Sequence, residues 1–224
     1  MTNQETIPTA NSFHMLRAMV GIGTLCGLLI VLTYEGTLPR IEQLRAQALQ
    51  EAIFKVLPGI SDTRAYAYKD GAFQLAADDD QVIVYAGYDD TGTFKGVAIE
   101  ASGQGYADVI RILYGYSPDK LKVVGFYVLE SKETPGLGDK IEIDPQFLSN
   151  FSALEVSLNK GLDALENAVI TVKSGTKVNP WEIDGITGAT ISSRAIGEIM
   201  GRSTEEWVPI IYKNQEVFKL KANE

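Results

Sequence analysis

The longest uninterrupted apolar segment lies near the N-terminus. Residues 18–34 carry no charged side chain, and the segment extends to residue 15 if the long Arg17 side chain reaches the interface. At about 1.5 Å per residue, such a helix is close to the length needed to cross a bilayer core. A cleaved signal peptide is the alternative, but no small-x-small cleavage site closely follows the apolar segment. We therefore predict one uncleaved transmembrane helix over residues 15–34, preceded by a flexible polar tail, residues 1–14.

The remaining residues, 35–224, have the pattern of a folded domain. Apolar residues recur at helical spacing from Leu38 to Leu57, which favours a helix packed in the domain over an isolated stem, and Pro58-Gly59 ends it. Strand-like segments follow from about Val82, at 81–88, 93–100, 109–116, 121–130 and 168–173. Turn sequences at residues 89–92 and 117–119 join the first four segments as two hairpins. This pattern predicts an α+β fold, with a mostly antiparallel twisted sheet and packed helices, rather than a doubly wound parallel sheet.

Composition removes several classes of function. The formal net charge is -9, and no basic stripe is present to meet phosphates, so nucleic acid is not an expected partner. Cys26 is the only cysteine and His14 the only histidine, which excludes disulfides, cysteine-based zinc sites and histidine-based acid–base catalysis within the chain. We predict neither a catalytic residue nor a metal site.

A glycine-containing turn precedes the last predicted helix. Residues 184–190, Asp-Gly-Ile-Thr-Gly-Ala-Thr, lead into a segment whose apolar residues recur at helical spacing from Ile191 onward. Thr190 is therefore expected at or near the N-cap, where free backbone N–H groups and the helix dipole favour an anion such as phosphate. Helix capping alone also explains these hydroxyl residues. The local pattern leaves open both a phosphate site and a helix that binds nothing.

The same segment carries a family resemblance. Asp-x-x-Thr-Gly-Ala-Thr-x-x-Ser, at residues 184–193, resembles the flavinylation motif of the FMN-binding domains found in Rnf and sodium-pumping NADH:quinone oxidoreductase complexes. In that family the last Thr of the Thr-Gly-Ala-Thr core carries FMN through a phosphoester bond, which a separate flavin transferase installs from FAD with a divalent metal. The resemblance implies that FMN is covalently attached to Thr190. The resemblance further implies that the following residues bind the cofactor: Asp184, Thr187, Gly188, Ala189 and Ser193.

The individual roles within the motif have structural alternatives. Asp184 either helps the transferase bind metal or orients the Thr190 hydroxyl; the structural alternative is an Asx turn or a cap before Gly185. Thr187 and Ser193 either hydrogen-bond the phosphate or cap the helix.

Two glycine-containing segments resemble parts of the same family that lie beside the flavin. They are Ser102–Tyr106 and Glu133–Gly138, and neither is a nucleotide fingerprint by itself. We expect Tyr106 and Leu137 to pack against the flavin ring, the alternative being a place in the core. The resemblance implies cofactor contacts at Gly103, Gly105, Tyr106, Glu133, Thr134, Gly136, Leu137 and Gly138.

The anchor, the chain length and the second segment are most similar to the G subunits of Rnf complexes. The C subunits of sodium-pumping quinone reductases share the motif but tend to be longer. The resemblance implies an electron-carrying subunit without independent turnover, whose partners are other membrane subunits and the transferase. It implies a bacterial inner-membrane location with the domain on the periplasmic side, which the flanking Arg17, Arg40 and Arg45 do not decide. A reversible FMN-binding module and an assembly subunit with no flavin in use are the alternatives.

Overall fold

The computed structural model describes residues 12–77 and 84–219, which fall into two units that meet between Gln47 and Ala48. The two predicted N-terminal helices form one continuous helix, α1 (Ser12–Val56), with Pro39 inside it. The prediction that the second of them packs in the domain holds only for its last turns, where Ala52, Ile53 and Val56 are buried; residues up to Gln47 belong to the first unit. Within the described residues, α1 is the one helix long and apolar enough to cross a membrane by length and composition. The predicted anchor lies in α1. Most of the predicted tail lies outside the described residues.

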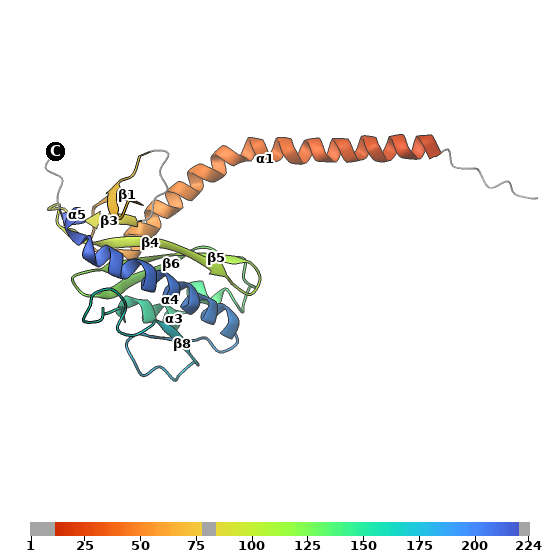
Figure 1. Ribbon diagram of the computed structural model, residues 1–224. Coiled ribbons are helices and arrows are strands. Elements are labelled where there is room, and N and C mark those ends of the chain that lie inside the picture. The colour runs from red at the N-terminus through yellow and green to blue at the C-terminus, as the bar shows by residue number, and fades with distance from the viewer. Residues whose placement is uncertain (1–11, 78–83, 220–224) are drawn as a thin grey trace, which may run out of the picture. The chain divides into compact units, whose positions relative to one another are not determined.

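The second unit is built on an antiparallel sheet of seven strands, in the order β2-β1-β3-β4-β5-β6-β7 (Figure 1). Two further strands, β8 (Ile170–Val172) and β9 (Glu182–Asp184), pair in parallel as a separate small sheet. The main sheet consists of β1 (Asp62–Lys69), β2 (Ala72–Leu75), β3 (Val84–Tyr88), β4 (Phe94–Gln104), β5 (Val109–Ser117), β6 (Lys122–Glu130) and β7 (Leu154–Glu155). The helices after β6 are α2 (Lys140–Ile143), α3 (Pro145–Ser149), the 3-10 turn η1 (Asn150–Ser152), α4 (Thr190–Lys213) and α5 (Gln215–Lys219).

The predicted α+β class and both hairpins, β3–β4 and β5–β6, are confirmed. The hairpin β1–β2 was not predicted, although its turn carries the strongest short hairpin signal, Asp-Gly. Asp70 and Gly71 both have positive φ, 52° and 82°, as a two-residue turn between twisted strands requires. The first residues of the predicted segment 81–88 lie outside the described part of the chain.

The sheet is covered on both faces, because successive side chains along a strand point to opposite sides. On β4, Ile99 belongs to the larger core, which α4 and α5 complete with Ile196, Met200 and Phe218. The neighbouring Ala98 faces the other way, into a smaller core with the last turns of α1. The sheet thereby fixes α4, and so the residues at the start of α4, on one face.

The last turns of α1 approach the sheet more closely than a side chain on the facing strands would allow. A Cβ added at Gly115 of β5 or at Gly125 of β6 would overlap the carbonyl oxygen of Val56. Gly115 and Gly125 are paired across the two strands, so together they leave a gap that the backbone of α1 fills. Val56 and Leu57 are buried there.

We expect Gly115→Ala to lower the free energy of unfolding of the domain by about 3 kcal/mol, because backbone atoms cannot move aside for the added methyl group. Urea unfolding in detergent, followed by tryptophan fluorescence, measures this. Gly36→Ala is the control, since a Cβ there meets nothing within 4 Å. Equal stability of the two variants would contradict the close approach.

Candidate functional site

The start of α4 is set by a tight turn. Ala189 donates its N–H to the carbonyl of Ile186 at 3.2 Å, and Gly188 in this turn has φ of +87°, a conformation that favours glycine. The Ser193 hydroxyl fixes the turn to the helix, because it accepts the N–H of Ile186 and donates to the carbonyl of Thr190, each at 3.3 Å. Ser193 is thus a buried residue that joins turn and helix.

Thr190 is the first helical residue, and Ala189 is the N-cap, with no side-chain cap hydrogen bond. The first N–H groups of any α-helix lack acceptors within the helix. Since no side chain supplies an acceptor here, the start of α4 presents free donors and the positive end of the helix dipole beside Thr190. The Thr190 side chain is exposed. An anion linked to its hydroxyl would meet favourable charge.

Thr190 borders two hollows. The first hollow, of about 380 Å³, lies between the β4–β5 turn, the loop after β6 and the first turn of α4. Its walls include three apolar side chains that remain half-exposed, Tyr106 (65%), Leu137 (52%) and Ile191 (56%), so a flat apolar group could cover them. It is lined by Tyr106, Glu133, Thr134, Leu137, Gly138, Gly188, Ala189, Thr190, Ile191 and Ser192.

The second hollow, of about 350 Å³, lies on the β8 side of Thr190 and has a different character. Lys173 and Arg194 line it and form no ion pair with another described residue. Hydroxyl residues surround them, including Thr187 and Ser193 of the predicted site. The first hollow is lined by no cation, so the two sides of Thr190 differ in charge.

Glu133 joins the segments around the first hollow. Its side chain is buried, with 6% exposure, and Oε1 accepts the N–H of Ala107 in the β4–β5 turn at 3.0 Å. Its other oxygen, Oε2, accepts a short hydrogen bond from the hydroxyl of Ser192 in the first turn of α4. A buried carboxylate is costly unless donors satisfy it, and these two donors do so from different segments.

The glycines next to Glu133 make room for it. A Cβ at Gly105 would lie 2.5 Å from Oε1 of Glu133 and 2.7 Å from Ile110. A Cβ at Gly138 would lie 2.8 Å from the Glu133 side chain and 2.9 Å from Oγ of Ser192. Both glycines are therefore explained by close approach.

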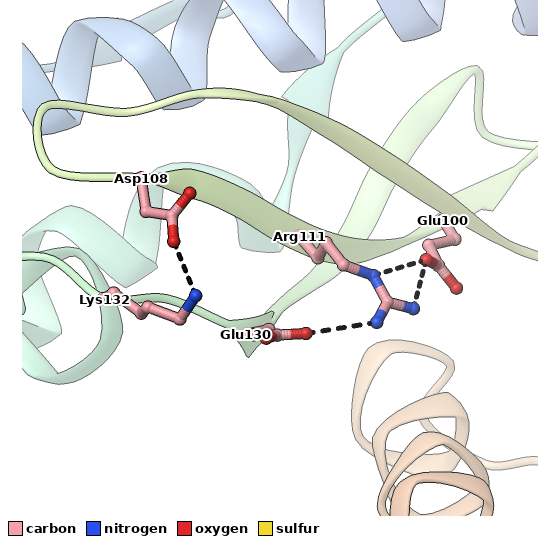
Figure 2. A network of polar contacts seen from close by, with 5 residues as sticks. All are labelled: Glu100, Asp108, Arg111, Glu130 and Lys132. Atoms are coloured by element: carbon pink, nitrogen blue, oxygen red, sulfur yellow. Dashed lines mark hydrogen bonds and ion pairs between the residues drawn. The ribbon is translucent and has the colours of Figure 1, made fainter. Parts of the chain in front are cut away.

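A second, exposed contact joins the same two loops. Lys132 Nζ lies 2.6 Å from Oδ2 of Asp108, and this hydrogen bond lowers the pKa of Asp108 (Figure 2). Beside it in Figure 2, Arg111 of β5 contacts Glu100 at 2.6 Å and Glu130 at 3.3 Å. Ion pairs this exposed contribute little to stability. The buried Glu133 is the stronger connection.

Four predicted site residues line neither hollow. Gly103 lies under α4, where an added Cβ would be 2.6 Å from Ile199. Gly136 has φ of +77° in the turn of its loop, and Gly105 faces Glu133. Asp184 accepts the N–H of Gly175 at 2.7 Å through Oδ1, which connects β9 to the turn after β8. In the described residues, no group of three or more His, Cys, Asp and Glu could hold a metal.

Several residues of the two hollows were not predicted, among them Lys173, Ile191, Ser192 and Arg194. Ile191 and Ser192 stand within the motif itself, and Arg194 directly follows it, so helical spacing from Thr190 could have indicated them. Lys173 ends a predicted strand and reaches the site only because β8 packs beside α4. No local signal indicated it.

Several known proteins are similar to this chain in sequence. A family model described as FMN-binding domain matches residues 105–204. The G subunit of the ion-translocating oxidoreductase complex of Methanosarcina acetivorans is 32% identical over 80% of this chain and 85% of its own length. The G subunit of the Na(+)-translocating ferredoxin:NAD(+) oxidoreductase complex of Acetobacterium woodii is 30% identical over 78% of this chain and 81% of its own.

The fold is also seen among solved structures. An example is the C subunit of the Na(+)-translocating NADH-quinone reductase from Parabacteroides distasonis, with a TM-score of 0.58 at 19% identity. The match covers 82% of this chain and 98% of that one.

We expect Gly138→Ala to destabilise the domain by about 2 kcal/mol, because the new methyl group must displace Glu133 or Ser192 from a closely packed contact. Chemical denaturation of the purified chain measures the change. Leu137→Ala is the control: Leu137 is half-exposed, so its truncation should change stability by about 0.5 kcal/mol or less. A Gly138 variant as stable as the Leu137 variant would show that the contact is loose.

Proposed function

This chain belongs to the family of G subunits of ion-translocating oxidoreductase complexes, and from that premise we propose that it carries FMN esterified to Thr190. Its FMN-binding domain and its relatives support an FMN-carrying subunit of a membrane-bound redox complex. The observation that carries the covalent assignment is the position of Thr190. Its side chain is exposed at the uncapped start of α4, at the border of both hollows.

The residues present fit a tethered flavin. Tyr106, Leu137 and Ile191 offer an apolar surface for a flat ring in the first hollow. The helix N-terminus, with Lys173 and Arg194 in the second hollow, offsets the single negative charge that a phosphodiester keeps. Thr187 borders the second hollow, where its hydroxyl can hydrogen-bond the phosphate.

In the attachment step, the exposed hydroxyl of Thr190 is the nucleophile. Oγ of Thr190 attacks the FMN-side phosphorus of FAD, the pyrophosphate bond breaks, AMP leaves, and the hydroxyl proton is released. A separate flavin transferase with a divalent metal performs this step, and it needs an unobstructed approach. Gly188 and Ala189, which precede Thr190, put no bulky side chain beside the hydroxyl.

The flavin supplies the redox chemistry, and the protein supplies its position and electrostatic surroundings. The bond through phosphate is a tether, which keeps a cofactor at high effective concentration where a dissociated one would be diluted. We propose that the chain relays electrons between cofactors of other membrane subunits and has no turnover by itself. The assembled complex couples this electron flow to ion translocation.

The first test replaces Thr190 by Ala in cells that contain the transferase. We expect the variant to fold but to lose covalent flavin, because the attacking oxygen is gone. In-gel flavin fluorescence after denaturation, and the intact mass of the chain, measure the attachment. Flavin that stays on the denatured Thr190→Ala variant would refute the site.

Two matched variants complete this test. Thr190→Ser keeps the hydroxyl and should retain labelling, whereas Thr187→Ala removes a neighbouring hydroxyl without removing the acceptor. Flavin that binds to the wild-type protein but leaves on denaturation would indicate a reversible FMN-binding module. Colourless wild-type protein of unmodified mass would favour an assembly subunit. Redox partners identified in the purified complex separate an Rnf-type from a quinone-reductase-type assembly.

We further propose that α1 anchors the chain in the bacterial inner membrane through residues 15–34, with residues 35–224 on the periplasmic side. Cys26 is the only cysteine, so replacing it by Ser gives a background for single-cysteine labelling. Val178 is 85% exposed in the domain, and Ser12 begins α1. We expect a membrane-impermeant maleimide to label Val178→Cys in spheroplasts, and Ser12→Cys only after lysis. The reverse pattern would contradict this orientation.

A further inference from the structure

The walls of the first hollow come from three segments that are distant in the sequence. Tyr106 stands on the turn between β4 and β5, Leu137 on the loop after β6, and Ile191 on the first turn of α4. Each is half-exposed and so has little packing of its own to hold it in place. The shape of the hollow therefore depends on what joins the three segments.

Glu133 is buried and accepts a hydrogen bond from each of the other two segments. It belongs to the loop after β6, and its two carboxylate oxygens accept one hydrogen bond from Ala107, next to Tyr106, and one from Ser192, next to Ile191. The bonded residues are thus immediate sequence neighbours of two of the wall residues. The ion pair between the same two loops, from Lys132 to Asp108, is exposed and is screened by solvent.

We infer that Glu133 is a positioning residue, which assembles the cofactor hollow by holding the β4–β5 turn and the loop after β6 against the first turn of α4. Each of its two oxygens accepts a hydrogen bond from one of the other segments, as this role requires. The inference rests on the proposed function in one respect only, namely that the group bound in the hollow is the flavin ring. The glycines at 105 and 138 support it, because they leave the space in which the carboxylate reaches both donors.

We expect the role of Glu133 to depend on its hydrogen-bond geometry rather than on its charge. Replacement by glutamine tests this, because it keeps the shape of the side chain and removes the charge. In Glu133→Gln the amide oxygen can accept the N–H of Ala107, and the amide nitrogen can donate to Oγ of Ser192. Shape and connections are kept while the charge is removed. Glu133→Ala removes both connections and leaves the buried hydroxyl of Ser192 and the N–H of Ala107 without this acceptor.

The test uses the full-length protein without flavin, in detergent, and follows hydrogen exchange at individual backbone amides. We expect Glu133→Ala to speed exchange at the Ala107 amide about ten-fold, because its acceptor is lost, with little change in β5 and β6. Glu133→Gln should restore wild-type exchange. Glu100→Gln is the matched control, since Glu100 is a half-exposed carboxylate that contacts Arg111 outside the hollow.

Ser192→Ala provides a second variant if Glu133→Ala does not fold. It removes one side of the connection and should speed exchange at Ala107 and in the first turn of α4, but not in the rest of the domain. Unchanged exchange at Ala107 in the foldable variants would overturn the inference. So would a uniform increase across the whole sheet, because that result indicates general stability rather than positioning.

A readout on loaded protein connects the hollow to its cofactor. We expect the attached flavin to show lower fluorescence anisotropy in Glu133→Ala than in wild type, and wild-type anisotropy in Glu133→Gln. Equal anisotropy in all three would overturn the inference that Glu133 assembles the hollow for the ring. If flavin proves absent from Thr190, the proposed function fails, while the exchange experiment still decides the role of Glu133.

Discussion

The end of α1 packs backbone against backbone on the sheet. The carbonyl oxygen of Val56 occupies a position over β5 and β6 that a Cβ at Gly115 or Gly125 would fill. This approach fixes the end of α1 on one face of the sheet. Because successive side chains of a strand point to opposite faces, the other face packs against α4 in the larger core. Packing against this face places α4, and with it Thr190, on the sheet.

In the proposed site, too, glycines leave space for a close contact, and there the space is filled by a polar side chain. Glu133 fits between Gly105 and Gly138, and its carboxylate is satisfied by donors from two other segments. Buried polar groups give directional connections that apolar contacts lack, and three loops can thereby keep one arrangement. On the other side of Thr190, Lys173 and Arg194 remain available to an anion, in a chain whose formal net charge is -9.

These features suit the proposed role of an electron carrier. The first hollow is open and half-exposed, which suits a cofactor that must exchange electrons at a surface. The helix α1 is long and apolar enough to restrict the domain to a membrane surface, and the proposed ester would restrict the flavin to the domain. Two successive restrictions of this kind raise the effective concentration of the redox group near its partners.

The sequence alone determined the elements whose cause is local. Apolar length predicted the long apolar helix contained in α1, turn residues predicted two hairpins, and the Thr-Gly-Ala-Thr segment located the start of α4 and the hydroxyl beside it. The turn at Gly188 could be predicted for the same reason, because its positive φ depends on the residue itself and not on distant contacts. The hairpin β1–β2 was readable from Asp70-Gly71 and was missed.

Only the tertiary structure decided which distant residues share the site. Glycines that look alike in the sequence have different roles in the structure. Gly103 leaves room for α4, and Gly105 and Gly138 leave room for Glu133. Gly136 adopts a positive φ in the turn of its loop. Lys173 reaches Thr190 through the packing of β8, and Ser192 is held by a hydrogen bond to a residue 59 positions away. Such contacts depend on how two faces of a sheet are filled, and no window of the sequence contains that information.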